Sequence, residues 1–173
     1  TALTAQNTQG VKAIVVPKPA FIKKEVDACF KDIRIDAVKI GMLADEETTK
    51  VVVQCLKKWR PRYVVLVPGM VAKSGDRLLK VKALKTLKEE LIPRVTLFTP
   101  NLPEASALLG YEVKTRAMMQ KAVRDLYRLG EGNAAVYLKG GHLKGNTLTD
   151  VYFDGKEIKT LTEQRIVTKN THG

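Results

Sequence analysis

The chain has little of several features that would each mark a particular class of protein. Its two cysteines, Cys29 and Cys55, match no metal-ligand spacing and provide no disulfide framework. No apolar run reaches about 18 residues, so no transmembrane helix is predicted, and the first residues lack the basic-then-apolar pattern of a signal peptide. We therefore predict a cytoplasmic protein that does not contact a membrane, with both cysteines buried as small apolar residues.

Acidic residues are scarce compared with basic ones. The chain has 30 Lys and Arg against 18 Asp and Glu, a net charge of +12, and aromatic residues make up only 6%. Such an excess can reflect solvated helix faces, attraction of a small phosphorylated ligand, or nucleic-acid binding. The basic residues are scattered, and no basic run is interleaved with aromatic residues. The pattern therefore favours solvated helix faces and argues against nucleic acid as a partner.

The length and patterning predict one α/β domain over residues 1–173. Short β-rich runs alternate with helical periodicity, which indicates βαβ units and a parallel sheet. Strands are predicted at 11–16, 37–40, 63–67, 95–98 and 134–139, and helices at 20–30, 45–59, 77–91, 103–109 and 116–129. Asp154 and Gly155, between runs 149–153 and 158–161, predict a C-terminal β-hairpin.

No P-loop, dinucleotide fingerprint, protein-kinase motif set or metal-hydrolase spacing of His and carboxylates occurs. The candidate site residues instead follow predicted strands. Asn101 and Glu104 come directly after the strand that ends near Pro100, where parallel sheets bind ligands. An Asn followed three residues later by Glu is also a capping-box pattern. The two interpretations are compatible, because a helix N-terminus attracts anions and a carboxylate can hold a bridging cation.

Lys139, Gly140 and Gly141 form a second candidate at the end of another strand. A lysine there can meet a phosphate as a point charge, and glycines permit close backbone approach; a tight turn with a solvated lysine is the alternative. His142 alone is more typical of a structural or exposed residue. The loop 71–76 is either a mobile flap or a plain surface loop. Gln6, in a polar cluster, can read a heterocycle edge with one donor and one acceptor.

Six segments, taken in order, are more specific than any one motif. They are 1–8 (TALTAQNT), 38–43 (VKIGML), 70–76 (MVAKSGD), 99–105 (TPNLPEA), 139–142 (KGGH) and 168–173 (TKNTHG). Together they resemble the hydroxymethylpyrimidine kinase / phosphomethylpyrimidine kinase family of thiamine biosynthesis, over essentially the whole chain. The resemblance implies a ribokinase-like fold, with a mostly parallel sheet flanked by helices on both faces. It also implies phosphorylation of 4-amino-5-hydroxymethyl-2-methylpyrimidine, and then of its monophosphate, with ATP and Mg²⁺, usually by a homodimer.

The resemblance also assigns roles to matching positions. Gln6 would hydrogen-bond the aminopyrimidine edge, and Met42 would pack on its ring. Asn101 and Glu104 would organise Mg²⁺, its waters and the ATP phosphates, with Glu104 reaching the metal through water. Lys139 would neutralise phosphate charge. These roles suit phosphoryl transfer, in which positioning and charge compensation do most of the work.

The C-terminal segment matches the approach to the family's anion hole. Thr168 and Thr171 would bind the nucleotide, and Gly173 would belong to the catalytic anion hole. The chain begins without a start methionine and stops on this turn. The resemblance implies that an N-terminal Gly-rich segment and a Thr-Gly-Cys continuation are missing, and that the residue that activates the substrate hydroxyl is among them. We therefore expect this chain to be part of a longer, competent protein.

One further position departs from the family pattern. The family commonly has an Asp where this chain has Val67, which cannot hold a metal-bound water, and the loss of one preorganised contact would lower the rate roughly 10²–10³-fold. Gly69 would lie at the substrate pocket, where it removes a pocket wall. These departures leave two alternatives open: a weakly active or non-catalytic pyrimidine-binding relative, or a pyridoxal kinase of the same superfamily.

Overall fold

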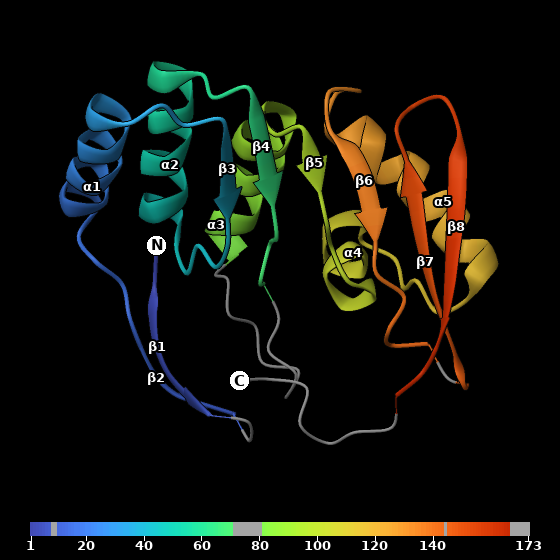
Figure 1. Ribbon diagram of the computed structural model, residues 1–173. Coiled ribbons are helices and arrows are strands. Elements are labelled where there is room, and N and C mark those ends of the chain that lie inside the picture. The colour runs from blue at the N-terminus through green and yellow to red at the C-terminus, as the bar shows by residue number, and fades with distance from the viewer. Residues whose placement is uncertain (8–9, 71–80, 144, 167–173) are drawn as a thin grey trace.

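The larger of two sheets contains six strands in the order β3-β4-β5-β6-β7-β8 (Figure 1). A computed structural model describes residues 1–7, 10–70, 81–143 and 145–166. The first four strands pair in parallel and the last two antiparallel. This confirms the mostly parallel sheet with a C-terminal hairpin. The strands are β3 (Ala37–Ile40), β4 (Tyr63–Leu66), β5 (Leu97–Phe98), β6 (Ala135–Leu138), β7 (Thr147–Phe153) and β8 (Ile158–Gln164).

The helices follow the predicted pattern with one local difference. They are α1 (Pro19–Asp32), α2 (Glu46–Trp59), α3 (Val81–Thr86), α4 (Leu102–Leu109) and α5 (Arg116–Leu129). Residues 77–80 of the helix predicted at 77–91 lie outside the described residues, and the last part of the prediction is a π-helical turn, Leu87–Leu91. A 3₁₀ turn, Ile92–Arg94, ends it, because Pro93 has no N–H to continue the helical hydrogen bonds. Among the described residues, no helix is long and apolar enough to cross a membrane.

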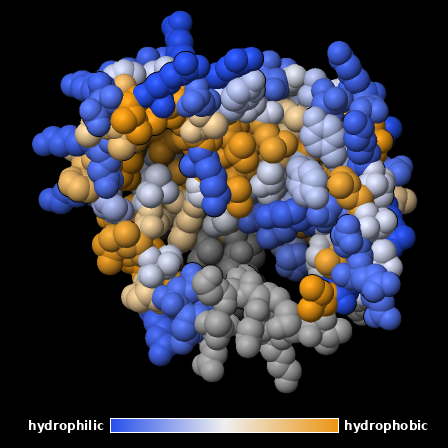
Figure 2. All heavy atoms as spheres, viewed as in Figure 1, coloured by the Kyte–Doolittle hydropathy of each residue, from blue (hydrophilic) through white to orange (hydrophobic). Residues whose placement is uncertain are grey.

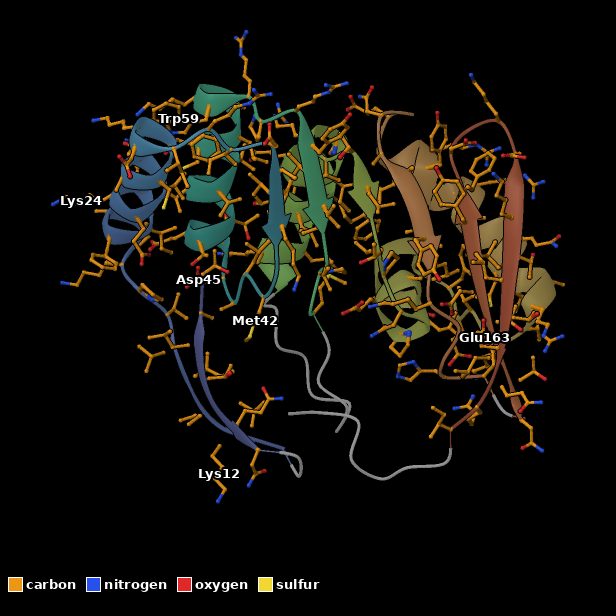
Figure 3. The ribbon with its side chains drawn as sticks, in the orientation of Figure 1. Lys12, Lys24, Met42, Asp45, Trp59 and Glu163 are labelled. Atoms are coloured by element: carbon orange, nitrogen blue, oxygen red, sulfur yellow. The ribbon has the colours of Figure 1, made fainter. Side chains whose placement is uncertain are left out.

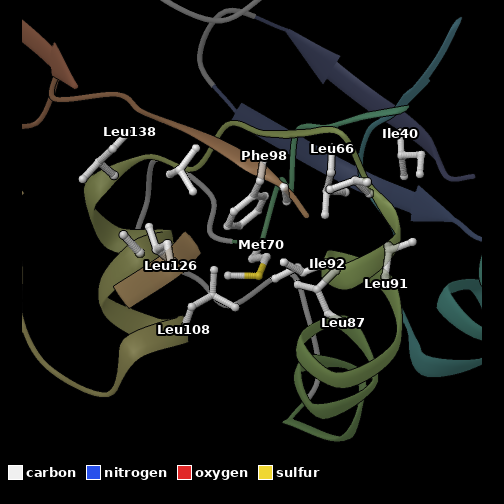
Figure 4. Packing of buried hydrophobic residues seen from close by; sticks show 14 of the residues in the cluster. Ile40, Leu66, Met70, Leu87, Leu91, Ile92, Phe98, Leu108, Leu126 and Leu138 are labelled. Carbon is white, nitrogen blue, oxygen red and sulfur yellow. The ribbon is translucent and has the colours of Figure 1, made fainter. Parts of the chain in front are cut away.

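The described helices α2 to α5 pack on one face of the sheet, so the prediction of helices on both faces is not confirmed by these helices. Strands β3 to β6 follow one another across the sheet, and right-handed crossovers between strands in that order place every connecting helix on the same side. The core lies between the sheet and these helices. It includes Leu66, Phe98 and Leu138 from the strands, with Met70 at its centre (Figure 4). The side chains that alternate with these on the strands are partly buried, and apolar residues gather across the middle of the face seen in Figure 2.

Asp27 joins α1 to α2. Its carboxylate accepts hydrogen bonds from Lys58 Nζ at 2.7 Å and Trp59 Nε1 at 2.8 Å, and it pairs with Lys23 at 2.6 Å. These donors, Lys23 foremost, hold the pKa of Asp27 well below its ordinary value. The Trp59 ring also stacks on Phe30, with centroids 5.2 Å apart (Figure 3 labels Trp59). The hydrogen bonds from Lys58 and Trp59 and the ring stack together fix α1 against α2, whereas the Lys23 pair lies within α1.

The second sheet is a separate antiparallel pair. Strand β1 (Leu3–Asn7) pairs with β2 (Gly10–Val15), and every described residue of both strands is exposed. The pair extends away from the six-stranded sheet, with Lys12 toward its far end (Figures 1 and 3). The sequence predicts the strand at 11–16 but no strand for the polar cluster around Gln6, because exposed polar residues lack the alternation of a half-buried strand.

The two cysteines differ in burial. Cys55 is buried in α2, as predicted, whereas Cys29 in α1 is exposed, so the prediction of burial is wrong for Cys29. The physical reason is the position of α1 at the edge of the molecule, where Ile22 is its only fully buried residue. Helical periodicity alone does not show how much of an outer helix other elements cover.

Candidate active site

Asn101 and Lys139 lie side by side at the carboxyl ends of β5 and β6. The two residues form an isolated parallel bridge, and the backbone N–H of Lys139 donates to the carbonyl of Pro100 at 2.9 Å. Neighbouring parallel strands end at the same edge of a sheet, so side chains that are 38 positions apart in the sequence are brought together. Asn101 and Lys139 therefore lie next to each other at one edge of the sheet.

Glu104 completes this cluster from the first turn of α4. Its Oε2 accepts the N–H of Asn101 at 2.9 Å, and the Asn101 side chain accepts the N–H of Glu104 at 2.9 Å. The predicted capping box is thus confirmed. Glu104 is only 3% exposed, and among the described residues it forms no ion pair. A buried carboxylate without a cationic partner is unfavourable unless something else compensates its charge.

A dipeptide, Gly69-Met70, links this cluster to the end of β3. The N–H of Met70 donates to Glu104 Oε1 at 3.1 Å. Gly69 has a positive φ of 51°, and a Cβ placed on it would lie 3.5 Å from the Cα of Met42 and 3.6 Å from its Cβ. The structure therefore brings together Met42 and Gly69, the two predicted pocket residues, and connects them to Glu104 through one backbone hydrogen bond. Figure 3 shows Met42 at the lower end of β3.

The glycines after Lys139 are held by the neighbouring strand β7. Asp150 accepts the N–H of Gly140 at 2.8 Å and the hydroxyl of Tyr137 at 2.9 Å. A Cβ on Gly140 would lie only 1.9 Å from the carbonyl oxygen of Thr149, whereas a Cβ on Gly141 would meet nothing within 4 Å. Gly140 is therefore required by packing against β7, while Gly141 faces open space. The carbonyl of Gly140 accepts the N–H of Leu143 at 2.9 Å, so residues 140–143 form a tight turn.

His142, in this turn, senses the charges of the cluster. Displacement of water by the surrounding protein lowers the pKa of His142 below its ordinary value, and the cations Lys139 and Arg165 lower it further. The carboxylate of Glu104 acts in the opposite direction. The balance of these effects favours the neutral form of the imidazole.

A cavity of about 680 Å³ adjoins the cluster on the side of α4 and α5. Its walls include Leu102 and Pro103 of α4, the segment 112–116, His142 and Leu143. Asn101, Glu104 and Lys139 do not line it. The cavity is therefore a neighbour of the predicted phosphate-binding cluster and not its interior.

Of the remaining predicted residues, Gln6 is described by the structure and is not brought into this cluster. Gln6 is exposed on β1, which starts beside Met42, where the Thr1 hydroxyl donates to the Met42 carbonyl. The loop 71–76 and the predicted residues Thr168, Thr171 and Gly173 lie outside the described residues. Within the described ranges, no group of three or more His, Cys, Asp or Glu side chains is placed to hold a metal ion directly.

Sequence reasoning missed the groups that support the cluster, namely Met70, Tyr137, Asp150 and Arg165. Met70 contributes through its backbone, which leaves no signal in residue type. Asp150 does leave a signal, since a carboxylate within a β-rich run is unusual unless it is hydrogen-bonded. Arg165 follows β8 and contacts backbone carbonyls only, so no complementary side chain marks it.

Comparison with known proteins agrees with this geometry. The family profile described as phosphomethylpyrimidine kinase matches residues 1–173. The chain is 46% identical to the thiamine biosynthesis bifunctional protein ThiED of Geobacter sulfurreducens, covering all of this chain and 35% of that protein. It is 44% identical to the hydroxymethylpyrimidine/phosphomethylpyrimidine kinase of Escherichia coli, covering 65% of that protein. The chain thus spans about one third and just under two thirds of these two relatives.

Solved structures show the same relationship. The crystal structure of phosphomethylpyrimidine kinase from Clostridium difficile has a TM-score of 0.82 at 39% identity, over 92% of this chain and 68% of that one. A pyridoxal kinase from Staphylococcus aureus in complex with AMP-PCP has a TM-score of 0.83 at 27% identity, over 97% of this chain and 60% of that one. These neighbours confirm the ribokinase-like fold. The full-length profile match and the identities above show that the chain belongs to the phosphomethylpyrimidine kinase family.

Proposed function

We propose that the intact protein carrying this chain transfers the γ-phosphoryl group of ATP to 4-amino-5-hydroxymethyl-2-methylpyrimidine, and then phosphorylates the monophosphate, in thiamine biosynthesis. The observation that carries the proposal is the convergence of Asn101, Glu104 and Lys139 at one sheet edge. Family membership supports the substrate, and the AMP-PCP complex of the related pyridoxal kinase supports a nucleoside triphosphate as the donor.

Each of the three residues has a distinct task in this transfer. The substrate hydroxyl oxygen forms a bond to the γ-phosphorus, the bond from that phosphorus to the β–γ bridging oxygen breaks, and the hydroxyl proton is lost. Lys139 offsets the negative charge of the phosphate oxygens as a point charge. Asn101 orients the phosphates with its amide, in addition to capping α4. The rate acceleration comes mainly from holding the reactants in line, which is the dominant contribution to catalysis of phosphoryl transfer.

Glu104 fits a hydrated Mg²⁺ ion. Each carboxylate oxygen accepts one N–H bond and keeps a second lone pair for a metal-bound water. The buried charge has no cationic partner among the described side chains, which suits a divalent ion that keeps most of its waters and contacts the substrate phosphates. When bound, Mg²⁺ neutralises the charge that develops on the phosphate oxygens.

The proposed pyrimidine site lies at the ends of β3 and β4. Met42 would pack on the ring, and Gly69 would leave space beside it. Gln6 would hydrogen-bond the aminopyrimidine edge, and Thr168, Thr171 and Gly173 would serve the nucleotide and the anion hole, as expected from the family resemblance. We also propose a homodimer; the exposed apolar side chains of Leu3 and Val15, 65% and 60% exposed, are consistent with a partner surface. Sedimentation of the intact protein tests the dimer, and a monomer at micromolar concentration contradicts it.

A coupled assay with the pyrimidine and MgATP tests the main proposal. We expect turnover of the pyrimidine with the intact protein, little turnover of pyridoxal, and loss of turnover in Lys139→Met. Lys24→Met, on exposed α1, is the matched control and is expected to keep full activity. Turnover of pyridoxal without turnover of the pyrimidine would instead make the protein a pyridoxal kinase.

Val67 favours a second candidate function, that of a weakly active or non-catalytic pyrimidine-binding protein. The residue directly follows β4, its N–H donates to the carbonyl of Ile40 at 2.8 Å, and its side chain cannot hold a metal-bound water. If this interpretation holds, Val67→Asp raises kcat by about 10²–10³-fold, the effect of one preorganised contact. An unchanged kcat at an ordinary kinase rate rejects it.

A further inference from the structure

The turn that follows Lys139 is held by the side chain of Arg165, which follows the edge strand β8. The guanidinium group of Arg165 donates from Nη1 to the carbonyl of Gly141 at 3.0 Å, from Nη2 to Leu143 at 2.6 Å and from Nε to Gly145 at 2.9 Å. One side chain thus gathers three backbone carbonyls of a single loop. A planar guanidinium has donors fixed in a fork, so it sets the positions of all three carbonyls together.

Arg165 is itself firmly placed. It follows β8, and its backbone N–H donates to the carbonyl of Asn146 at 2.8 Å, which extends the β7–β8 pairing by one step. Strand β7 also supplies Asp150, which accepts the N–H of Gly140. The hairpin therefore holds the loop at both ends, by a carboxylate on the first glycine and by a guanidinium on the later carbonyls.

The contacts also determine which backbone groups remain available. The C=O of one residue and the N–H of the next point in opposite directions in a trans peptide. With the Gly141 carbonyl on Arg165, the N–H of His142 points away from the guanidinium. Within the described part of the chain, the N–H groups of Gly141 and His142 donate no hydrogen bond. Two free donors next to Lys139 make a suitable contact for phosphate oxygens.

We propose that Arg165 is a positioning residue that holds residues 140–143 and Gly145 so that Lys139 and the free N–H groups of Gly141 and His142 meet the triphosphate. The proposal rests on the proposed kinase function for its ligand. Arg165 acts through the three loop carbonyls, each of which accepts a hydrogen bond from its guanidinium group. The pyrimidine site at Met42 and Gly69 is on different strands and does not depend on this contact.

Steady-state kinetics of the intact protein test the role in catalysis. We expect Arg165→Met to lower kcat/KM for ATP by about 10- to 100-fold, the range expected when reacting groups are displaced by up to about 1 Å. The KM for the pyrimidine should change less than about twofold. Arg165→Lys should recover little, because one ammonium cannot reach three carbonyls. In Arg165→Ala, added methylguanidinium should restore part of the ATP kinetics. Arg34→Met, whose side chain is 90% exposed, is the control.

Hydrogen exchange separates this proposal from the kinase assignment. In Arg165→Met, the Leu143 amide, which is bonded to Gly140, should exchange at least about tenfold faster, with the β7–β8 amides unchanged. Unchanged exchange at the loop overturns the proposal even if the protein proves to be no kinase. Wild-type ATP kinetics in Arg165→Met also overturn it, as do equal losses for both substrates without rescue by methylguanidinium. Absence of turnover in the wild-type protein would reject the kinase function and leave the exchange result to decide the loop contact.

Discussion

Replacing Glu104 by Gln separates the two tasks assigned to this carboxylate. The wild-type side chain accepts the N–H of Met70 at 3.1 Å and the N–H of Asn101 at 2.9 Å, one on each oxygen. Gln has only one oxygen, so one of the two N–H groups faces an NH₂ donor. Because Glu104 is only 3% exposed, the N–H group that loses its acceptor has few alternative partners. An unsatisfied buried donor costs about 1–3 kcal/mol.

Urea unfolding of the intact protein measures this loss. We expect Glu104→Gln to lower the free energy of unfolding by about 1–3 kcal/mol. Glu163→Gln, on the exposed face of β8, should stay within about 0.5 kcal/mol of the wild type. Equal stability of Glu104→Gln and the wild type would refute the buried, doubly hydrogen-bonded carboxylate. A second measurement addresses the metal: Mg²⁺ with ADP should raise the Tm of the wild type by ligand linkage, and this shift should be smaller in Glu104→Gln.

Three further predictions follow from the same contacts. Asn101→Ser should unfold within about 0.5 kcal/mol of the wild type, because Ser caps helices as well as Asn, while the KM for ATP rises; an unchanged KM would show that the amide serves the cap alone. Gly140→Ala should lower the free energy of unfolding in urea by about 1–3 kcal/mol, because its Cβ would lie 1.9 Å from the Thr149 carbonyl oxygen. Gly141→Ala should leave this free energy almost unchanged, and equal losses in the two variants would contradict the packing argument. The lowered pKa of Asp27 stabilises the fold above the ordinary carboxyl pKa, and this contribution is lost as the pH falls below about 4. The free energy of unfolding should therefore depend less on pH in the acid range in Asp27→Asn than in the wild type. Asp36→Asn should show the wild-type dependence, because the side chain of Asp36 is 75% exposed.

Much of the fold could be predicted from local patterns. Apolar runs located β3 to β6, helical spacing located α2 and α5, and Asp154-Gly155 located the hairpin. The meeting of Asn101 and Lys139 was also predictable, because residues that follow parallel strands share one edge. These inferences succeed because each depends on periodicity or on a topological rule.

Other features depend on contacts between segments that the sequence does not relate. The pairing of β1 with β2 outside the main sheet joins residues that lack a buried face, so no periodicity reveals it. The exposure of Cys29 depends on what covers α1. The contacts of Arg165 go to carbonyls that any residue type would provide. Tertiary contacts determine each of these three features, and local sequence propensity does not predict them.

The single backbone hydrogen bond between Met70 and Glu104 has a consequence for how two ligands would influence each other. Gly69 abuts Met42 on one side, and Met70 is anchored in the core and bonded to the carboxylate on the other. If a bound ring displaces Met42, the displacement would reach Glu104 through only two residues, Gly69 and Met70. Thermodynamic linkage then requires reciprocity: whatever factor the pyrimidine applies to nucleotide affinity, the nucleotide applies to pyrimidine affinity. Titrating each ligand with and without the other would reveal this cooperativity, and independent binding would show that the dipeptide does not transmit the displacement.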